Sequence, residues 1–239
     1  MITEINRHEA KRCSQNGEDG ILEWIFTQIG ITNRIFLEIG TGNGYENNTL
    51  DLLLNHEWAG MWIEPQDLTN PDLKGKPLKH EKILATPQNV NQICIRNKIT
   101  GRIDLASIDV DGNDFWIWRA LSMVIPRVMV IEYNPSLDPG GSISVKYHDE
   151  FDRFAFDSTG FYHGASLAAF CNLADRKGYA LVGCDKTGTN AFFVLRSELK
   201  GDLRAVPPAT AYFPLVQRHN SGTPQVQFER IKHLEFERI

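Results

Sequence analysis

The chain has 239 residues, of which 42% are hydrophobic, enough apolar material for the packed core of one α/β domain with additions. Its formal net charge is −5 and its Lys and Arg residues are scattered, which argues against a nucleic-acid partner. No stretch approaches the ~20 consecutive apolar residues that span a bilayer, and the N-terminus lacks the pattern of a signal peptide. The four cysteines show no C-x-x-C spacing, so we expect a cytoplasmic protein with reduced thiols and no membrane span.

A helix is the first element that the sequence predicts. Its apolar face repeats at helical spacing and it ends at Gly30, while Ser14 or Asn16 would cap its start. The residues of that apolar face are Ile21, Leu22, Ile25, Phe26 and Ile29. We take residues 1–33 as an N-terminal helical segment.

A glycine-rich turn follows the first predicted strand, which includes Ile35 to Leu37. Glu38 closes the strand, Gly40, Gly42 and Gly44 follow, and a helix-like segment begins at Glu46. Glycines permit positive φ and let a ligand approach the main chain, so the turn indicates either a cofactor site or an ordinary αβ turn. The spacing differs from the dinucleotide fingerprint, in which the third glycine comes three positions later.

The second predicted strand, residues 60–63, ends in an acidic residue. Glu64 lies 24 positions after Gly40 and is followed by Pro65. In nucleotide-binding α/β folds an acid at about this spacing accepts hydrogen bonds from the ribose hydroxyls. A solvated glutamate at a strand end is the alternative, and the joint spacing favours the ribose role.

The rest of the chain alternates strands and helices and then closes with a hairpin. Residues 66–82 read as a surface connection, Pro126 is expected to stop the fourth helix, and a long connection runs from Ser136 to Gly160. The remaining strands are expected at 83–86, 103–108, 127–135, 179–184 and 191–195, and the remaining helices at 90–98, 115–121 and 162–178. This order predicts a doubly wound, Rossmann-like sheet of seven strands, mostly parallel with an antiparallel C-terminal hairpin, within residues 34–200.

Acidic residues gather where the fourth and fifth strands end. Asp109, Asp111 and Asp114 follow the fourth strand, and Glu132 closes the fifth. Ligands of doubly wound sheets lie at the carboxyl ends of the strands, so these groups are placed for chemistry. Crowded carboxylates require a cation, a base role or helix N-terminal amides, and helix capping explains only Asp114 and its neighbour Asn113.

These motifs together resemble the FkbM-type methyltransferases, over roughly residues 13–195. The motifs that carry the resemblance are Ser14-Gln15-x-Gly17-Glu18-Asp19, Leu37-Glu38-x-Gly40, Trp58-x-Gly60-x-Trp62-Ile63-Glu64-Pro65, Ser107-Ile108-Asp109-x-Asp111-Gly112-Asn113-Asp114 and Val130-Ile131-Glu132-Tyr133-Asn134. The resemblance implies the class I methyltransferase fold and S-adenosylmethionine-dependent O-methylation of a sugar, glycan or natural product. It implies cofactor-binding roles for Gln15, Glu38, Gly40, Gly42, Asn43, Asn48, Glu64, Pro65 and Asp109.

The acid cluster also resembles the magnesium site of macrocin-type sugar O-methyltransferases. By that resemblance Asp109, Asp111, Glu132 and Asn134 would hold Mg²⁺, which prefers oxygen ligands. Glu132 and Asn134 stand where that family has paired aspartates, so the sequence leaves the metal open.

Methyl transfer to an alcohol needs a base that removes the hydroxyl proton. Asp111 or Asp109 would serve, with His148 and His163 as the next candidates, although a single histidine is more often a surface or capping residue. The acceptor is expected to be a small molecule or a glycan.

Two other classes of function stay open, a nicotinamide oxidoreductase and a non-catalytic Rossmann-like binding or assembly module. Residues 201–239 form a C-terminal extension that is either a subunit contact in a homo-oligomer or a cover over the cleft.

Overall fold

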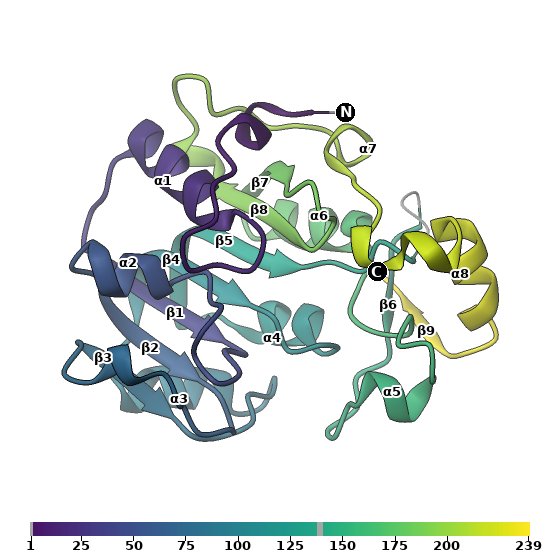
Figure 1. Cartoon of the computed structure of the whole chain (residues 1–239), viewed down its shortest axis with the longest axis horizontal. Helices are drawn as coiled ribbons and strands as arrows, with labels where there is room; N and C mark the ends of the chain where they lie inside the picture. The colour runs from purple at the N-terminus through teal and green to yellow at the C-terminus, as the bar shows by residue number, and fades with distance from the viewer. Residues whose placement is uncertain (1, 138–140) are drawn as a thin grey trace.

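The computed structural model describes residues 2–137 and 141–239. Met1 and residues 138–140, which belong to the predicted N-terminal segment and the long connection, lie outside the described residues. A seven-stranded sheet in the order β3-β2-β1-β4-β5-β8-β7 forms the centre of the protein (Figure 1). Its strands are β1 (Ile35–Ile39), β2 (Ala59–Ile63), β3 (Leu78–Glu81), β4 (Gly101–Ile108), β5 (Val124–Glu132), β7 (Tyr179–Cys184) and β8 (Asn190–Leu195). The predicted fold class is confirmed.

Strand direction follows the prediction as well. β1 pairs in parallel with both β2 and β4, and β5 continues the parallel set beside β4. β8 runs antiparallel to both of its neighbours, β5 and β7, which makes the predicted hairpin. Because β2 and β3 lie on one side of β1 and the later strands on the other, the chain changes direction at β1. A doubly wound sheet binds its ligand at the carboxyl ends of the strands beside such a point.

Helices cover both faces of the sheet and bury two apolar layers against it (Figure 1). α1 (Glu18–Ile29) and α2 (Leu50–Asn55) contribute Ile21, Leu22 and Leu53 to one layer, which also contains Phe36 of β1. The other layer contains residues of α3 (Val90–Arg96), α4 (Asp114–Ala120), α6 (Leu167–Arg176) and α7 (Pro208–Ala211). The central strands carry few polar residues because both of their faces are buried. No helix among the described residues has the length and apolar character needed to cross a membrane.

The prediction for the third strand was wrong. The strand is Leu78–Glu81, inside the predicted surface connection, whereas residues 83–86 lie beyond its end. β3 pairs only with β2 and is an edge strand, so its sequence need not be apolar. The apolar residues that suggested a strand, Leu84 and Ala85, line a cleft instead.

Of the two predicted caps of the first helix, Ser14 is confirmed, because its hydroxyl oxygen accepts a hydrogen bond from the first-turn N–H of Asp19 at 3.2 Å, whereas the side chain of Asn16 caps no helix N–H. Gly17, with φ of 143°, precedes α1 and supplies no side-chain cap. The Asp19 carboxylate accepts hydrogen bonds at 2.8 Å from the Ser14 hydroxyl and from the backbone N–H groups of residues 12–14. The side chain of Glu18 binds the N–H groups of Asn16 and Gly17. The acids of the first turn therefore hold the preceding loop in place, and Ser14 of that loop in turn accepts the N–H of Asp19.

The prediction that Pro126 stops the fourth helix was wrong, because Pro126 lies within β5. α4 ends earlier, at Ala120, and Pro126 pairs in register with Ile103 of β4. Its missing N–H is tolerated because β8 joins β5 only from Val128 onward, so one side of the strand is free of ladder hydrogen bonds there.

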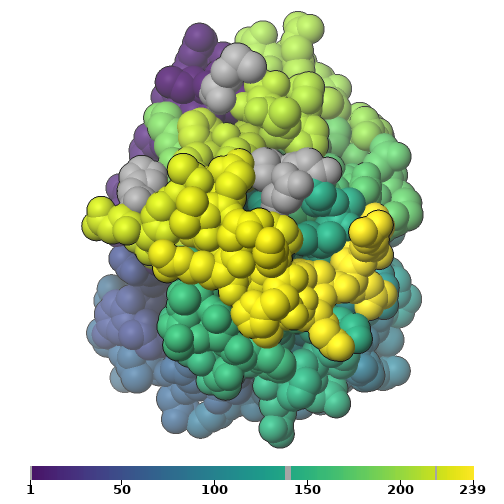
Figure 2. Space-filling model, turned by 90° about the vertical axis from the view of Figure 1, so that its right-hand side faces the viewer, coloured from purple at the N-terminus to yellow at the C-terminus, as the bar shows by residue number. Residues whose placement is uncertain are grey.

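The long connection and the C-terminal residues build a small second layer at one end of the sheet. β6 (Ile143–Val145) pairs antiparallel with β9 (Phe236–Arg238), and α8 (Pro224–Ile231) packs beside them. The short helix α5 (Arg153–Phe156) belongs to the same region. Figure 2 shows the C-terminal residues, in yellow, spread over this end of the molecule. Two segments far apart in sequence thus enclose the space beyond the ends of β4 and β5.

Candidate functional site

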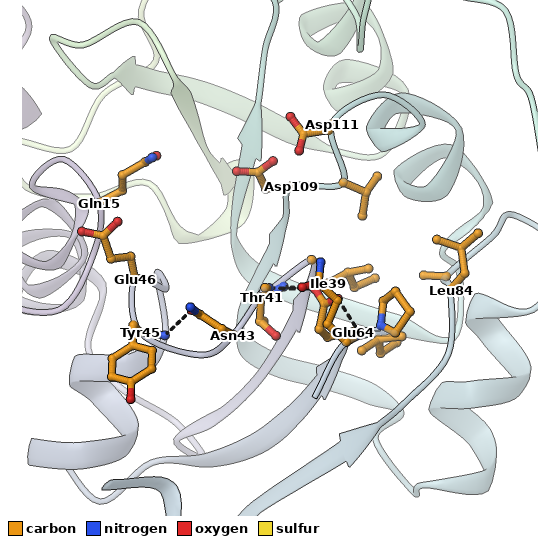
Figure 3. A pocket seen from close by; sticks show the side chains of 17 residues that line it. Gln15, Ile39, Thr41, Asn43, Tyr45, Glu46, Glu64, Leu84, Asp109 and Asp111 are labelled. Atoms are coloured by element: carbon orange, nitrogen blue, oxygen red, sulfur yellow. Dashed lines mark hydrogen bonds between the residues drawn. The ribbon is translucent and has the colours of Figure 1, made fainter. Parts of the chain in front are cut away.

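A cleft of about 500 Å³ opens at the carboxyl ends of β1, β2 and β4 (Figure 3). Of the residues predicted to bind the cofactor, it is lined by Gln15, Gly40, Gly42, Asn43, Glu64, Pro65 and Asp109. Thr41, Tyr45, Glu46, Gln66, Leu84 and Asp111 also line it. Glu38 and Asn48 do not reach it.

Gly40 lets two strand ends approach each other. Its φ is 83°, and a Cβ at this position would lie 1.6 Å from the carbonyl oxygen of Asp109. Gly42 also has positive φ, 52°, but a Cβ there would meet no atom within 4 Å. Gly40 is therefore required by the packing of the turn, whereas Gly42 leaves open space over the main chain for a ligand.

Glu64 joins the end of β2 to the glycine turn. Its Oε2 accepts hydrogen bonds from the N–H groups of Thr41 at 2.9 Å and Gly42 at 2.7 Å, and its Oε1 accepts one from Gln66 at 2.9 Å. The side chain is buried yet lines the cleft. A carboxylate has about four acceptor positions, so one remains for a ligand hydroxyl.

Glu38, which the sequence places in the cofactor site, supports the turn from behind. Its carboxylate accepts hydrogen bonds from the N–H groups of Asn48 at 2.9 Å and Thr49 at 3.0 Å, and from the Thr49 hydroxyl. Asn48 in turn donates to Ser107 at 3.0 Å. Burial raises the pKa of Glu38 to about 7, with the hydrogen bonds to Thr49 and Asn48 acting against the rise.

This pKa makes stability depend on pH. The folded pKa of Glu38 lies above its ordinary value of 4.5, so its favourable contribution is complete below about pH 4.5 and is lost as pH rises through 7. Glutamine cannot ionise, so the stability of Glu38→Gln should not respond to pH at this position. The amount by which the unfolding free energy of the wild type exceeds that of Glu38→Gln should therefore fall by about 2–3 kcal/mol between pH 4.5 and 8. Urea unfolding at several pH values measures this difference. Glu57→Gln, at a side chain that is 88% exposed, is the control, and an equal pH response in both variants would contradict the prediction.

A second cavity, of about 380 Å³, adjoins the cleft. Gln15, Asp109 and Asp111 line both spaces, so the two communicate at these side chains. Its other walls are Glu132, Arg153, Phe154, Thr159, Thr189, Leu215, Gln217 and Arg218. We call this space the chamber. The long connection and the C-terminal extension supply most of it, and neither carries a sequence motif that would have identified Arg153 or Arg218 in advance.

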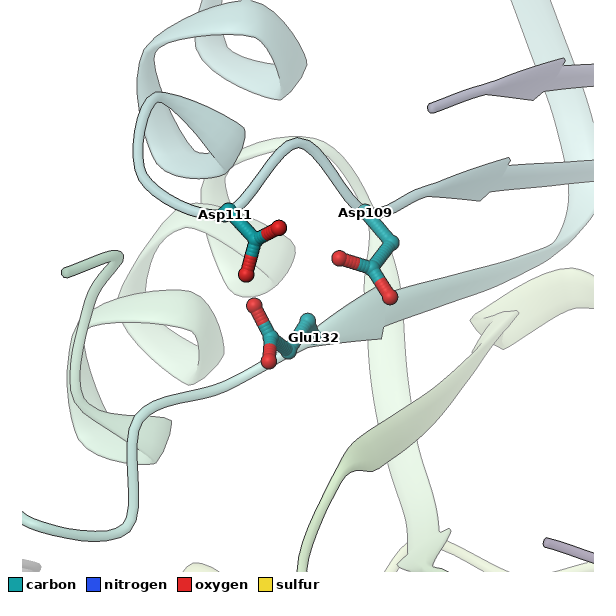
Figure 4. Close-up of side chains that lie close together, drawn as sticks. All are labelled: Asp109, Asp111 and Glu132. Atoms are coloured by element: carbon teal, nitrogen blue, oxygen red, sulfur yellow. The ribbon is translucent and has the colours of Figure 1, made fainter. Parts of the chain in front are cut away.

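Asp109, Asp111 and Glu132 converge at the boundary between the cleft and the chamber (Figure 4). One carboxylate oxygen from each lies within 4.8 Å of the others. Asp111 has a positive φ of 57° and a side chain that is 67% exposed, and it forms an ion pair with Arg153. Arg153 also donates to the carbonyl oxygen of Gly160, which anchors the guanidinium to the connection. The structure thus brings together three of the four residues predicted to hold a metal.

His163 contacts this cluster from behind. Its Nε2 lies 2.9 Å from Nη2 of Arg218, which can only donate, so Nε2 accepts and a neutral ring carries its proton on Nδ1. That Nδ1 lies 3.5 Å from Oε2 of Glu132, and neither atom has a closer hydrogen-bond partner among the described residues. Burial, with Arg153 and Arg218 nearby, lowers the pKa of His163 well below its usual value. His163 is therefore a neutral donor aimed at Glu132.

Three carboxyl groups at or beside the boundary have raised pKa values. Burial and the neighbouring Glu132 raise the pKa of Asp109 well above its usual value, and the same two causes raise that of Asp114 to about 8. Burial and Asp111 raise the pKa of Glu132 to about 7. These shifts mark a place that favours a proton or another cation.

The remaining predicted site residues lie elsewhere. Asn134 is buried, and its side-chain oxygen accepts from Ser136 at 2.9 Å and Arg218 at 3.2 Å. Its amide donates to the carbonyl oxygens of Phe161 and His163, so it supports the chamber wall and does not face the acid cluster. His148 is exposed and its ring lies 5.2 Å from that of Phe156. Neither residue lines the cleft or the chamber.

No protein-family model matches the sequence, and no curated protein matches it. Among solved structures, the N-terminal domain of EvdMO1, determined in the presence of SAH and D-fucose, covers 74% of this chain and 80% of its own, with 13% identity and a TM-score of 0.44. An O-methyltransferase from Bacillus cereus in complex with SAH covers 79% and 83%, with 14% identity and a TM-score of 0.44. A putative hemolysin from Lactococcus lactis covers 89% and 99%, with 14% identity and a TM-score of 0.48. Likenesses this distant assign no substrate or chemistry to the chain.

Proposed function

We propose that the chain is an S-adenosylmethionine-dependent methyltransferase that methylates a hydroxyl of a sugar, a glycan or a natural product. The observation that carries the proposal is a pair of connected spaces on a doubly wound sheet. One is a cleft bounded by the glycine turn and Glu64, and the other is a polar chamber reached past Asp109 and Asp111. A cleft of about 500 Å³ is within the range of small-molecule and cofactor sites.

The residues divide the reaction between the two spaces. In the cleft, Glu64 is placed to accept a hydrogen bond from a ribose hydroxyl, and the open main chain at Gly42 admits the rest of the cofactor. S-adenosylmethionine supplies an electrophilic methyl carbon on a sulfonium. Asp109 and Asp111, at the boundary, are placed to orient the acceptor hydroxyl and remove its proton.

Residues 201–239 serve in this proposal as a cover over the chamber, where the methyl acceptor would bind, and not as a subunit contact. Leu215, Gln217 and Arg218 line the chamber, and Arg218 is buried with hydrogen bonds to Ser136 and Gly160. An extension that only joined subunits would not need a buried cation inside the site.

Titration calorimetry with S-adenosylmethionine, SAH and NAD tests the proposal. S-adenosylmethionine and SAH should bind and NAD should not. Binding of NAD alone would favour the oxidoreductase, and binding of none of the three would favour a non-catalytic module.

The Glu64 assignment predicts a loss of cofactor affinity. Glu64→Ala should weaken S-adenosylmethionine binding by about 1–3 kcal/mol, because it removes charge-assisted hydrogen bonds both to the ribose and to the glycine turn. Glu64→Gln keeps one carbonyl oxygen and should lose less. Calorimetry measures both, and an unchanged affinity in Glu64→Ala would count against the ribose role.

Besides S-adenosylmethionine in the cleft, Mg²⁺ is a candidate cofactor, and its place would be the cluster of Asp109, Asp111 and Glu132. The three oxygens within 4.8 Å fit the hard-oxygen preference of this ion, and Asp109, Asp111 and Glu132 would hold it. A bound Mg²⁺ would lower the pKa of the acceptor hydroxyl. Chelation should then abolish turnover, and Asp109→Asn or Glu132→Gln should raise the Mg²⁺ concentration needed. Full turnover after exhaustive chelation would remove the ion from the mechanism.

A further inference from the structure

The boundary between the cleft and the chamber is where a transferred methyl group has to cross. The cleft itself fits S-adenosylmethionine, because the main chain at Gly42 is open and Glu64 keeps an acceptor position for a ribose hydroxyl. Gln15, Asp109 and Asp111 line both spaces and so form the boundary. The positively charged sulfur that carries the methyl group therefore belongs beside these three side chains.

Asp109 is the carboxylate at this boundary that lacks a cation. Within the part of the chain that the structure describes, its side chain accepts no hydrogen bond and forms no ion pair. Asp111 is paired with Arg153, and Gln15 is uncharged. Figure 3 shows Asp109 between Asp111 and Thr41 of the glycine turn. Asp109 is thus the group left to face a positive charge that enters from the cleft.

The backbone of Asp109 is fixed at the edge of the cleft. Its N–H donates to the carbonyl oxygen of Ile39 at 2.9 Å, and a Cβ at Gly40 would lie 1.6 Å from its carbonyl oxygen. The residue is therefore tied both to the end of β1 and to the turn that bounds the cleft. A carboxylate on a backbone held in this way loses little conformational freedom when a ligand binds beside it.

The charges around Asp109 favour a cation next to it. Glu132, Asp114 and Asp111 add negative charge, whereas Arg153 is the cation that acts on Asp109. Arg153 is already paired with Asp111. Opposite charges attract more strongly in a partly buried site than in open water, so a cation beside Asp109 gains an attraction that a neutral group does not.

We propose that Asp109 is the charge partner of the sulfonium and makes the cleft bind S-adenosylmethionine more tightly than its demethylated product, SAH. The inference rests on the proposed methyltransferase function. When the acceptor oxygen bonds to the methyl carbon, the electron pair of the broken carbon–sulfur bond stays on the sulfur, and the hydroxyl proton passes to Asp111. The sulfur is then neutral, so its attraction to Asp109 is lost and release of the product is favoured.

Titration calorimetry on the full chain with S-adenosylmethionine, SAH and sinefungin, at pH 8 in the presence of EDTA, tests the proposal. S-adenosylmethionine and SAH differ in the methyl group and in the charge that it places on the sulfur. Sinefungin has a carbon in place of the sulfur and an amino group in place of the methyl group, so it also carries a positive charge there. S-adenosylmethionine and sinefungin should each bind about 10-fold or more tightly than SAH.

Three variants assign this preference to one side chain. Asp109→Asn keeps the size of the residue and should bring the three affinities to within about 2-fold of one another. It should keep the SAH affinity of the wild type, which also shows that it folds. Glu64→Gln is the matched control, because the ribose is common to all three ligands, and it should weaken each by a similar factor. Asp111→Asn should also keep the preference, because Arg153 already neutralises Asp111.

The outcomes separate the role of Asp109 from the methyltransferase function. A wild-type preference smaller than about 10-fold, or a preference that Asp109→Asn keeps, would overturn the role of Asp109. Equal loss of the preference in Asp109→Asn and Asp111→Asn would overturn it too, because the preference would then belong to the carboxylates as a group. Failure of both S-adenosylmethionine and SAH to bind the wild type would contradict the methyltransferase function itself.

Discussion

Replacing Gly40 with alanine is expected to abolish S-adenosylmethionine binding and to destabilise the fold. The new Cβ would lie 1.6 Å from the carbonyl oxygen of Asp109, and the residue has a φ of 83°. Neither the main chain of β1 nor that of β4 can move without breaking the ladder between them, in which the N–H of Asp109 donates to the carbonyl oxygen of Ile39 at 2.9 Å. We expect an unfolding free energy lower by more than about 3 kcal/mol and a cofactor affinity at least about 100-fold weaker.

Gly42→Ala is the matched control, because the same change is made two residues away at another positive φ. A Cβ at Gly42 meets nothing within 4 Å, so only the left-handed conformation is penalised, by about 1–2 kcal/mol. Urea unfolding and calorimetry on both variants separate close packing from backbone strain. Equal losses in the two variants would show that the approach of the two strand ends is not what Gly40 provides.

The sheet was predictable because its strands are buried on both faces. Continuous apolar runs such as 128–131 and 191–195 identify central strands whatever the helices do. β3 escaped prediction for the opposite reason. It is a half-exposed edge strand with the sequence Leu-Lys-His-Glu, and the apolar residues after it serve the cleft. Pro126 likewise misled because its strand has a free side that sequence alone does not reveal.

The cleft and the chamber also differ in how far the sequence predicts them. The cleft was predictable because strand ends place Gly40, Glu64 and Asp109 by topology, and topology follows from the order of the elements. Glu38 was harder to assign, because a strand-end acid can bind either a ligand or the next loop, and here it binds the loop. The chamber wall comes from residues 153–159 and 215–218, which are placed by tertiary contacts and follow no local pattern.

Asp111→Asn is expected to lower turnover by roughly 10²–10⁴ while S-adenosylmethionine affinity stays near that of the wild type. Asparagine keeps the size and much of the hydrogen bonding of the side chain but cannot accept the hydroxyl proton. The structure places Asp111 at the boundary of the cleft and the chamber, outside the contacts that hold Glu64 to the glycine turn. Calorimetry with S-adenosylmethionine and single-turnover rates with the same acceptor measure the two effects separately.

Arg153→Gln separates proton removal by Asp111 from a role in which Asp111 only holds Arg153 in place. Arg153 pairs with Asp111 and with the carbonyl oxygen of Gly160 but lies away from the cofactor cleft. If Asp111 acts as the base, Arg153→Gln should keep most of the turnover that Asp111→Asn loses. If both variants lose the same amount, the ion pair is what matters, and the base is Asp109. If Mg²⁺ in excess restores Asp111→Asn, the carboxylate is a metal ligand. Nearly full turnover of Asp111→Asn at every Mg²⁺ concentration would exclude both roles for Asp111.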